Sequence, residues 1–170
     1  MVYLIIAIIL LVIVAPIIRV LPSKEQREQM TKRRLAMSKG ISVELVRIED
    51  PDPDPKKHRS TTGKALPREL SVAAYRIHRG RSALEAEKLS WKLLRFAAEK
   101  RPQLTSQWYW ADAQSALKDG ALYDHLSAQV DHLPADVKQI EEKNQFISLY
   151  WHERGEVTEV IDFLKRTVEV

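Results

Sequence analysis

Three short clusters combine histidine with acidic side chains, the residue types that bind metals and transfer protons. Two of them, Asp124-His125 and Asp131-His132, lie seven residues apart in a stretch whose spacing predicts one helix. Seven residues rise about 10 Å along a helix axis, whereas two ligands of one zinc ion must each lie about 2 Å from it. This helix alone therefore cannot supply both ligands, and we predict no metal site.

The third cluster, His152-Glu153-Arg154, follows a predicted strand, a position where functional residues often lie. It lacks the second histidine of a zinc-protease motif, so we interpret it as a loop with local charge pairing. The chain has no cysteine, its five glycines are too scattered for a phosphate-binding loop, and no serine-nucleophile motif occurs. We predict no catalytic, cofactor-binding or metal-binding residues, no cofactor and no enzymatic activity.

Aromatic and basic residues alternate between positions 75 and 110, a pattern that suggests binding. Platforms for single-stranded nucleic acid combine these side chains, but the aromatic residues of small domains more often form the core and its rim. The candidate partner-binding residues are Tyr75, Arg76, Trp91, Arg95, Trp108 and Trp110. We expect a protein partner. A membrane-tethered nucleic-acid-binding module using residues 75–110 is the alternative.

Residues 2–18 contain no charged side chain. The residues after this segment are interpreted in relation to it. The length of the segment meets the lower limit for crossing a bilayer core of about 30 Å. No basic residue precedes the segment and no small-residue cleavage site follows it, so it does not resemble a cleaved signal peptide. We predict an uncleaved transmembrane helix over residues 1–21.

Charge sets the expected orientation of this helix. Seven basic and two acidic residues lie between Arg19 and Lys39, and basic flanks stay in the cytoplasm. In a bacterium this places the N-terminus outside, the helix in the inner membrane and the following domain in the cytoplasm.

A basic juxtamembrane helix is expected over residues 22–40. Ser23 and Gln26 have the spacing of a capping box, and Gly40 is typical of a helix end. The helix has few apolar residues, so we expect it to lie against anionic lipid rather than to pack into the domain. The expected membrane-surface residues are Arg19, Lys24, Arg27, Lys32, Arg33 and Arg34.

Residues 41–170 are expected to form one α+β domain. Ile41 to Ile48 is rich in β-branched residues and predicts a strand, and the Pro/Asp-rich stretch 50–67 predicts an exposed loop. Further strands, in an antiparallel meander, are favoured at 72–79, 91–97 and 106–110. The alternative for part of this region is one helix over 83–100.

The last third of the domain has clearer patterns. Leu122 to Leu133 has helical apolar spacing, residues 137–142 and 145–152 predict a hairpin, and a final amphipathic helix follows Gly155. The expected fold class is therefore α+β: one transmembrane helix, a basic neck helix, and an antiparallel sheet packed by C-terminal helices.

The first third of the chain resembles a known family in two segments. They are Leu21-Pro22-Ser23-Lys24-Glu25-Gln26-Arg27 and Ser38-Lys39-Gly40-Ile41-Ser42-Val43. Together with the apolar segment they are similar to YajC proteins, single-pass accessory subunits of the bacterial Sec translocon. Beyond Val43 the chain departs from that family. As a whole it looks like a group of gammaproteobacterial membrane-anchored proteins that sometimes carry the translocase label.

The resemblance implies a function for the whole chain but no site residue. We expect a non-catalytic, single-pass accessory or assembly protein of the inner membrane, which presents a small cytoplasmic binding domain and associates with the translocon.

Overall fold

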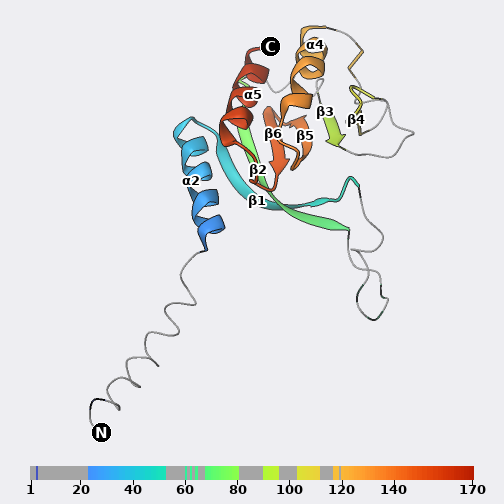
Figure 1. The fold of residues 1–170 in the computed structure, drawn as a ribbon. Coiled ribbons are helices and arrows are strands. Elements are labelled where there is room, and N and C mark those ends of the chain that lie inside the picture. The colour runs from blue at the N-terminus through green and yellow to red at the C-terminus, as the bar shows by residue number, and fades with distance from the viewer. Residues whose placement is uncertain are drawn as a thin grey trace. The chain divides into compact units, whose positions relative to one another are not determined.

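The computed structural model describes most of the chain beyond its N-terminal segment (Figure 1). The described residues are 3, 23–52, 60, 62, 64, 68–80, 90–95, 103–111, 117–118 and 120–170. The chain divides into two units, Met1–Lys32 and Arg33–Val170, and each is described by itself. The whole sheet and the helices that pack on it belong to the second unit.

Helix α2, Lys24–Ser38, begins with the predicted capping box. The Ser23 amide donates to Gln26 Oε1 at 2.8 Å, and the Gln26 amide donates to Ser23 Oγ at 3.2 Å. The two side chains thus satisfy two backbone donors that have no partner inside the helix. The predicted start of the helix is confirmed.

The same helix ends in the arrangement that Gly40 predicts. Gly40 has a φ of 84°, and its amide donates to the carbonyl of Met37. The amide of Ile41 donates to the carbonyl of Ala36. This is a Schellman motif, in which the left-handed position favours glycine. Ala36 and Ile41 are both buried, so the end of the helix is part of the core of the second unit.

Six antiparallel strands form one sheet in the spatial order β1-β2-β6-β5-β3-β4. Their bounds are β1 Ser42–Glu49, β2 Glu69–His78, β3 Trp91–Arg95, β4 Trp108–Trp110, β5 Val137–Lys143 and β6 Phe146–Trp151. The expected strands near 72–79, 91–97 and 106–110 are present, so a helix over 83–100 is wrong for residues 91–95. The meander is also wrong, because the β5–β6 hairpin pairs between β2 and β3.

The C-terminal elements follow the predicted periodicity. Asn144 and Gln145, with φ of 52° and 69°, form the two-residue turn between β5 and β6, one position later than expected. Helix α4, Ala121–Gln129, continues into the 3-10 helix η1, Val130–His132. Helix α5, Val157–Glu169, closes the chain with its apolar stripe buried.

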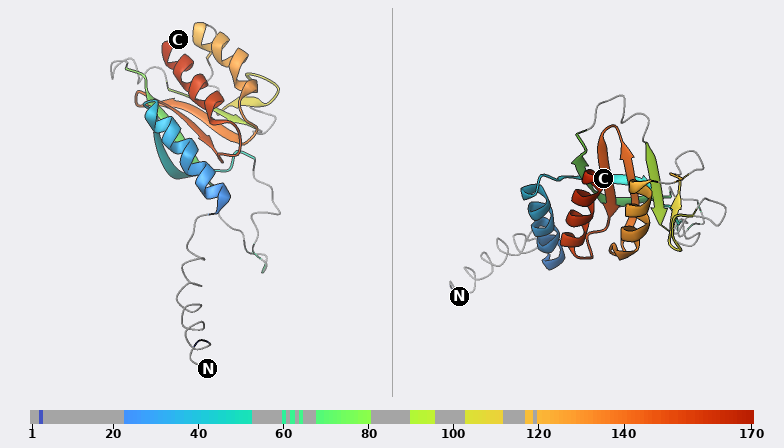
Figure 2. Two further views of the ribbon diagram at one scale, coloured as in Figure 1. Left: turned by 60° about the vertical axis from the view of Figure 1, so that its left-hand side comes forward. Right: turned by 90° about the horizontal axis from the view of Figure 1, so that it is seen from above.

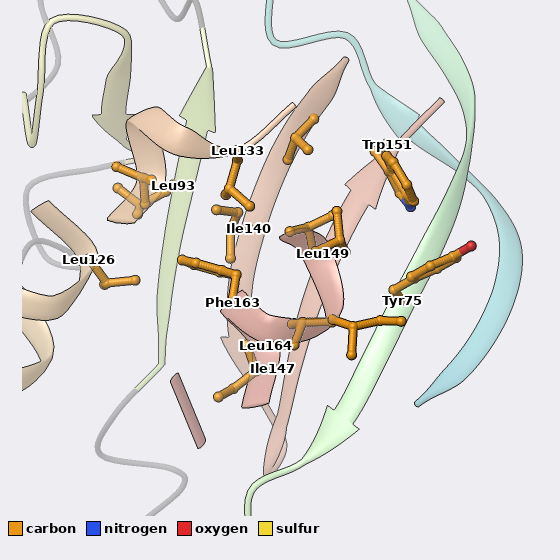
Figure 3. Packing of buried hydrophobic residues seen from close by; sticks show 14 of the residues in the cluster. Tyr75, Leu93, Leu126, Leu133, Ile140, Ile147, Leu149, Trp151, Phe163 and Leu164 are labelled. Carbon is orange, nitrogen blue, oxygen red and sulfur yellow. The ribbon is translucent and has the colours of Figure 1, made fainter. Parts of the chain in front are cut away.

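Helices α4 and α5 cover one face of the sheet (Figure 2). Alternation along the strands points Tyr75, Ile147 and Leu149 to this face, where Figure 3 shows them beside Phe163 and Leu164 of α5. The registers of β2 and β6 place these residues on adjacent strands. The main core therefore lies between the sheet and the two C-terminal helices.

The predicted fold class requires a correction. The structure is α+β, with a six-stranded antiparallel sheet and helices. Among the described residues, however, no helix has the length and apolar character to cross a membrane. The segment 1–21, to which the transmembrane helix was assigned, lies outside the described residues except for Tyr3. The fold class therefore does not include the membrane-spanning element that the sequence pattern predicts.

Candidate functional site

Most of the candidate partner-binding residues lie inside the folded unit. The buried ones are Tyr75, Trp91, Arg95, Trp108 and Trp110. Two of the indole groups bond inside the unit: Trp91 Nε1 donates to Glu142 at 2.8 Å, and Trp108 Nε1 donates to the carbonyl of Val130 at 3.0 Å. Arg76 is partly exposed and pairs with Glu44 across β1 and β2 at 2.7 Å.

These positions bear on the nucleic-acid alternative. Stacking on a base requires an exposed ring face, whereas the three tryptophans of this set are at most 1% exposed. Arg95 lies 5.4 Å from the centre of the Trp108 ring, so its cation already faces an aromatic side chain of the same chain. The three tryptophans of this set therefore offer no ring face for base stacking.

The two Asp-His clusters do not converge on a metal. His132 and Asp131 are exposed on η1, whereas His125 is half-buried and stacks on Phe163. In the described part of the chain, no group of three or more His, Asp or Glu side chains could hold a metal ion. His125 instead contacts Thr167 Oγ1 through Nε2 at 3.0 Å. Because that hydroxyl donates to the carbonyl of Phe163, Nε2 of His125 must be the donor to it.

The His152-Glu153-Arg154 cluster contains an ion pair that sequence reasoning missed. Glu153 has a φ of 61°, and its side chain is only 2% exposed. Arg33 Nε donates to Glu153 Oε1 and Oε2 at 2.8 and 3.1 Å, and Tyr75 Oη donates to Oε1 at 2.9 Å. The hydrogen bond to Glu153 raises the pKa of Arg33, and burial followed by the Glu153 charge raises the pKa of Tyr75. The three residues join the part of α2 that belongs to the second unit, residues 33–38, to the sheet and to the β6–α5 turn.

This pairing corrects the expectation for the neck helix. Residues 33–38 do pack into the domain, through Arg33 and the buried Ala36. The composition of the helix predicted that it would not pack into the domain, because its two contact residues, one alanine and one arginine, add very little apolar character to the sequence. Of the other expected membrane-surface residues, Lys24, Arg27 and Arg34 are exposed and Lys32 is half-buried, while Arg19 lies outside the described residues.

A second buried ion pair lies on the same face of the sheet. Arg79 pairs with Glu142 of β5, and both side chains are 1% exposed. The Glu142 carboxylate also accepts the Trp91 N–H. We interpret the pair as a tie between the end of β2 and the β3–β5 part of the sheet.

A cleft of about 280 Å³ lies between the α4–η1 segment and α5. Its lining is largely polar and comes from Gln129, His132, Leu133, Glu159, Asp162, Phe163 and Arg166. Small-molecule sites are usually concave and mostly apolar, with a few convergent polar groups. This cleft is open and charged, so it is a weak candidate for a ligand site.

The outer edge of β1 is the remaining candidate, and the hydrogen bonding of the strand defines it. The amide of Asp50 donates to the carbonyl of Arg68 at 2.8 Å, one position beyond the pair Glu49–Glu69. Bonded positions alternate in an antiparallel pair, so the even-numbered residues of β1 bond to β2. The odd-numbered residues direct N–H and C=O away from β2; they are Val43, Leu45, Arg47 and Glu49.

The next pair of strands supports this assignment. The amide of Arg79 donates to the carbonyl of Gln145, one position beyond the pair His78–Phe146. The odd-numbered residues of β2 therefore bond to β6, which leaves its even-numbered residues for β1. Both observations give the same alternation.

The edge of β1 is accessible along its length. No residue of the strand is buried, and Leu45 is 69% exposed, the highest value for a large apolar side chain among the described residues of the second unit. Within the described residues, no strand pairs with β1 on the side away from β2. Exposed edges of this length are templates for another strand. We take this edge as the candidate functional site.

Sequence reasoning placed a strand here but could not identify it as an edge. One available signal was the isolated Leu45-Val46 apolar step beside charged residues, which breaks the alternation of a half-buried strand. Comparison with known proteins adds no assignment, since no family model, curated protein or solved structure matches the chain.

Proposed function

We propose that this chain is a non-catalytic accessory protein of a membrane complex, in which the unit Arg33–Val170 binds a protein partner. The observation that carries the proposal is the accessible outer edge of β1, where the backbone groups of four residues face away from the sheet. Backbone donors and acceptors of this kind bind an extended protein segment. The buried polar clusters of the same unit hold its elements together, which supports binding rather than catalysis.

The proposal places the protein at the cytoplasmic face of a bacterial inner membrane. Two sequence properties support that location: the uncharged segment 2–18 and the seven basic residues that follow it by position 39. Basic side chains near a membrane surface are each attracted to anionic lipid by about 1 kcal/mol. The resemblance of residues 21–43 to YajC proteins makes the Sec translocon the first partner to test.

Chemical crosslinking in isolated membranes tests the proposal. We expect the tagged full-length chain to sediment with membranes and to form a reproducible crosslinked product with a translocon subunit. A variant that interrupts the apolar segment, Leu10→Lys with Ile13→Lys, should leave the membrane fraction and lose the product. A matched pair of added lysines at exposed positions of α4 and α5, Ala128→Lys with Thr158→Lys, is the control and should change neither.

Two results would contradict the proposal. One is a wild-type chain that stays in the supernatant. The other is a membrane-bound chain that forms no crosslinked product with any protein under conditions that crosslink known subunits of the complex.

A further inference from the structure

We propose that the partner binds by strand addition, as an extended segment paired with the outer edge of β1. The segment has apolar residues opposite Val43 and Leu45 and a basic residue opposite Glu49. This inference rests on the proposed function and names the chemistry of its partner.

Backbone geometry is the first support. Val43, Leu45 and Arg47 direct their N–H and C=O groups away from β2, as the alternation of hydrogen bonds requires. An added strand can bond to each of these residues at both groups. No side chain of β1 is buried under another element, so an added strand can approach its outer edge. β1 is also longer than the opposite edge strand β4, which has three residues.

The side chains along the edge of β1 determine where the partner segment carries its apolar residues. Val43 is half-buried and packs against the main core, whereas Leu45 on the same face is mostly exposed. Residues directly opposite in neighbouring strands have their Cβ atoms about 5 Å apart, so apolar partner residues would cover both. Burying an exposed leucine in this way removes apolar surface from water.

The charges around Glu49 determine where the partner segment carries its basic residue. Glu49 lies directly opposite Glu69 in the β1–β2 register, and like charges in such a pair are unfavourable. Arg47 reaches Glu69 only at 4.0 Å, and both side chains are largely exposed. Asp50 and Asp52 follow immediately in the chain. A lysine or arginine opposite Glu49 on the added strand would offset this concentration of carboxylates.

A second copy of β1 fits these positions less well. Antiparallel pairing about a two-fold axis keeps the faces of both sheets, so odd-numbered residues oppose odd-numbered residues. The register that pairs Leu45 with Val43 of the other copy sets Glu44 opposite Glu44. The register that pairs Leu45 with Leu45 sets Glu49 opposite Ile41. Neither register supplies a cation to Glu49. The register that sets Arg47 opposite Glu49 places Leu45 opposite Pro51, so it leaves the apolar positions without apolar side chains that suit a strand, and we commit to a different protein.

Amide hydrogen exchange of the full-length chain in detergent tests the geometry directly. The probe is a short capped peptide that alternates valine and threonine and carries lysines at one end. At about 1 mM peptide, a concentration that detects weak binding, exchange should slow about tenfold at Val43, Leu45 and Arg47. The amides of Glu44 and Val46, already bonded to β2, should change little. A peptide with glutamates in place of lysines is the matched control and should bind more weakly.

Two substitutions separate backbone pairing from side-chain contact. Leu45→Pro removes one outward-facing N–H and should weaken peptide binding about tenfold, the scale of one lost hydrogen bond. Leu45→Thr keeps that N–H in a residue that favours strands and should weaken it by less than about threefold. Because proline is tolerated on edge strands where its missing N–H faces solvent, both variants should melt near the wild-type temperature.

The outcomes decide between the alternatives. Slower exchange at the odd-numbered residues, with Leu45→Pro weaker than Leu45→Thr, supports strand addition. Slower exchange elsewhere, or none, overturns it, as does equal loss in both variants, which would indicate a side-chain patch. Protection that appears without peptide and rises with protein concentration would assign the edge to a second copy. A crosslinked partner that survives Leu45→Pro would leave the proposed function intact and reject only this mode of binding.

Discussion

At the scale of single residues, one ion pair joins the first residue of the second unit to the β6–α5 turn. Arg33 and Arg34 are neighbours in a basic run and are indistinguishable by composition. In the structure Arg34 is exposed, whereas Arg33 bonds to the buried carboxylate of Glu153, which also accepts the Tyr75 hydroxyl. A buried carboxylate without its cation is costly, so the adjacent arginines should respond differently to the same substitution.

We expect Arg33→Gln to lower the free energy of unfolding by about 3 kcal/mol, since it leaves Glu153 buried without its cation. Arg34→Gln should change it by less than about 0.5 kcal/mol, as is usual for an exposed site. Denaturant unfolding of both variants measures the difference. Equal stability of the two would mean that the Arg33–Glu153 pair does not contribute to the fold.

At the scale of elements, the β6–α5 turn packs closely against the residues that precede β5. The amide of Arg154 donates to Asp136 Oδ2 at 2.8 Å, and Gly155 lies against the ring of Pro134. A Cβ added at Gly155 would meet Pro134 Cβ at 2.3 Å and Cγ at 2.7 Å. Because a proline ring cannot rotate away, the contact requires glycine at this turn for reasons of space rather than of φ.

Gly155→Ala should therefore destabilise the protein by about 1–3 kcal/mol, the usual range for overpacking. Its cost should fall when Pro134 is replaced by glycine, because the colliding atoms are then absent. Chemical denaturation of the two single variants and the double variant completes the cycle. A cost that is the same in both backgrounds would show that the clash is relieved by backbone movement instead.

At the scale of the whole molecule, two half-buried histidines couple folding to pH. Burial, followed by the charges of Arg166 and Arg79, lowers the pKa of His125. Burial, followed by the charges of Arg154 and Lys138, lowers the pKa of His152, against smaller opposing effects of Asp136 and of a hydrogen bond to the Ser71 backbone. With a lowered pKa in the folded state, the unfolded chain binds more protons as the pH falls below about 6.5. Acid in this range should therefore reduce the free energy of unfolding.

His125→Gln should flatten this acid dependence, because glutamine keeps a donor for Thr167 but does not titrate. Unfolding midpoints at about pH 7 and about pH 5 give the slope. The control is His132→Gln, at an exposed position, which should leave the slope near that of the wild type. A slope unchanged by His125→Gln would exclude His125 as a source of the effect.

Local pattern was sufficient for most of the individual elements of this protein. The capping box at Ser23, the helix end at Gly40, the β5–β6 hairpin and helix α5 depend on residues close together in sequence, so their signals are readable there. The region 71–110 is ambiguous in the sequence, because aromatic and basic residues suit both a buried strand and an exposed surface.

Tertiary structure alone decided how those elements combine. Strand order depends on pairing between distant segments, so the insertion of β5 and β6 beside β2, and the edge position of β1, have no local signal. The same holds for the bond from Arg33 to Glu153, whose partners lie 120 positions apart. Burial of the tryptophans likewise follows from the packing of helices on the sheet. Periodicity reports which face of an element is apolar, but not which other element covers it.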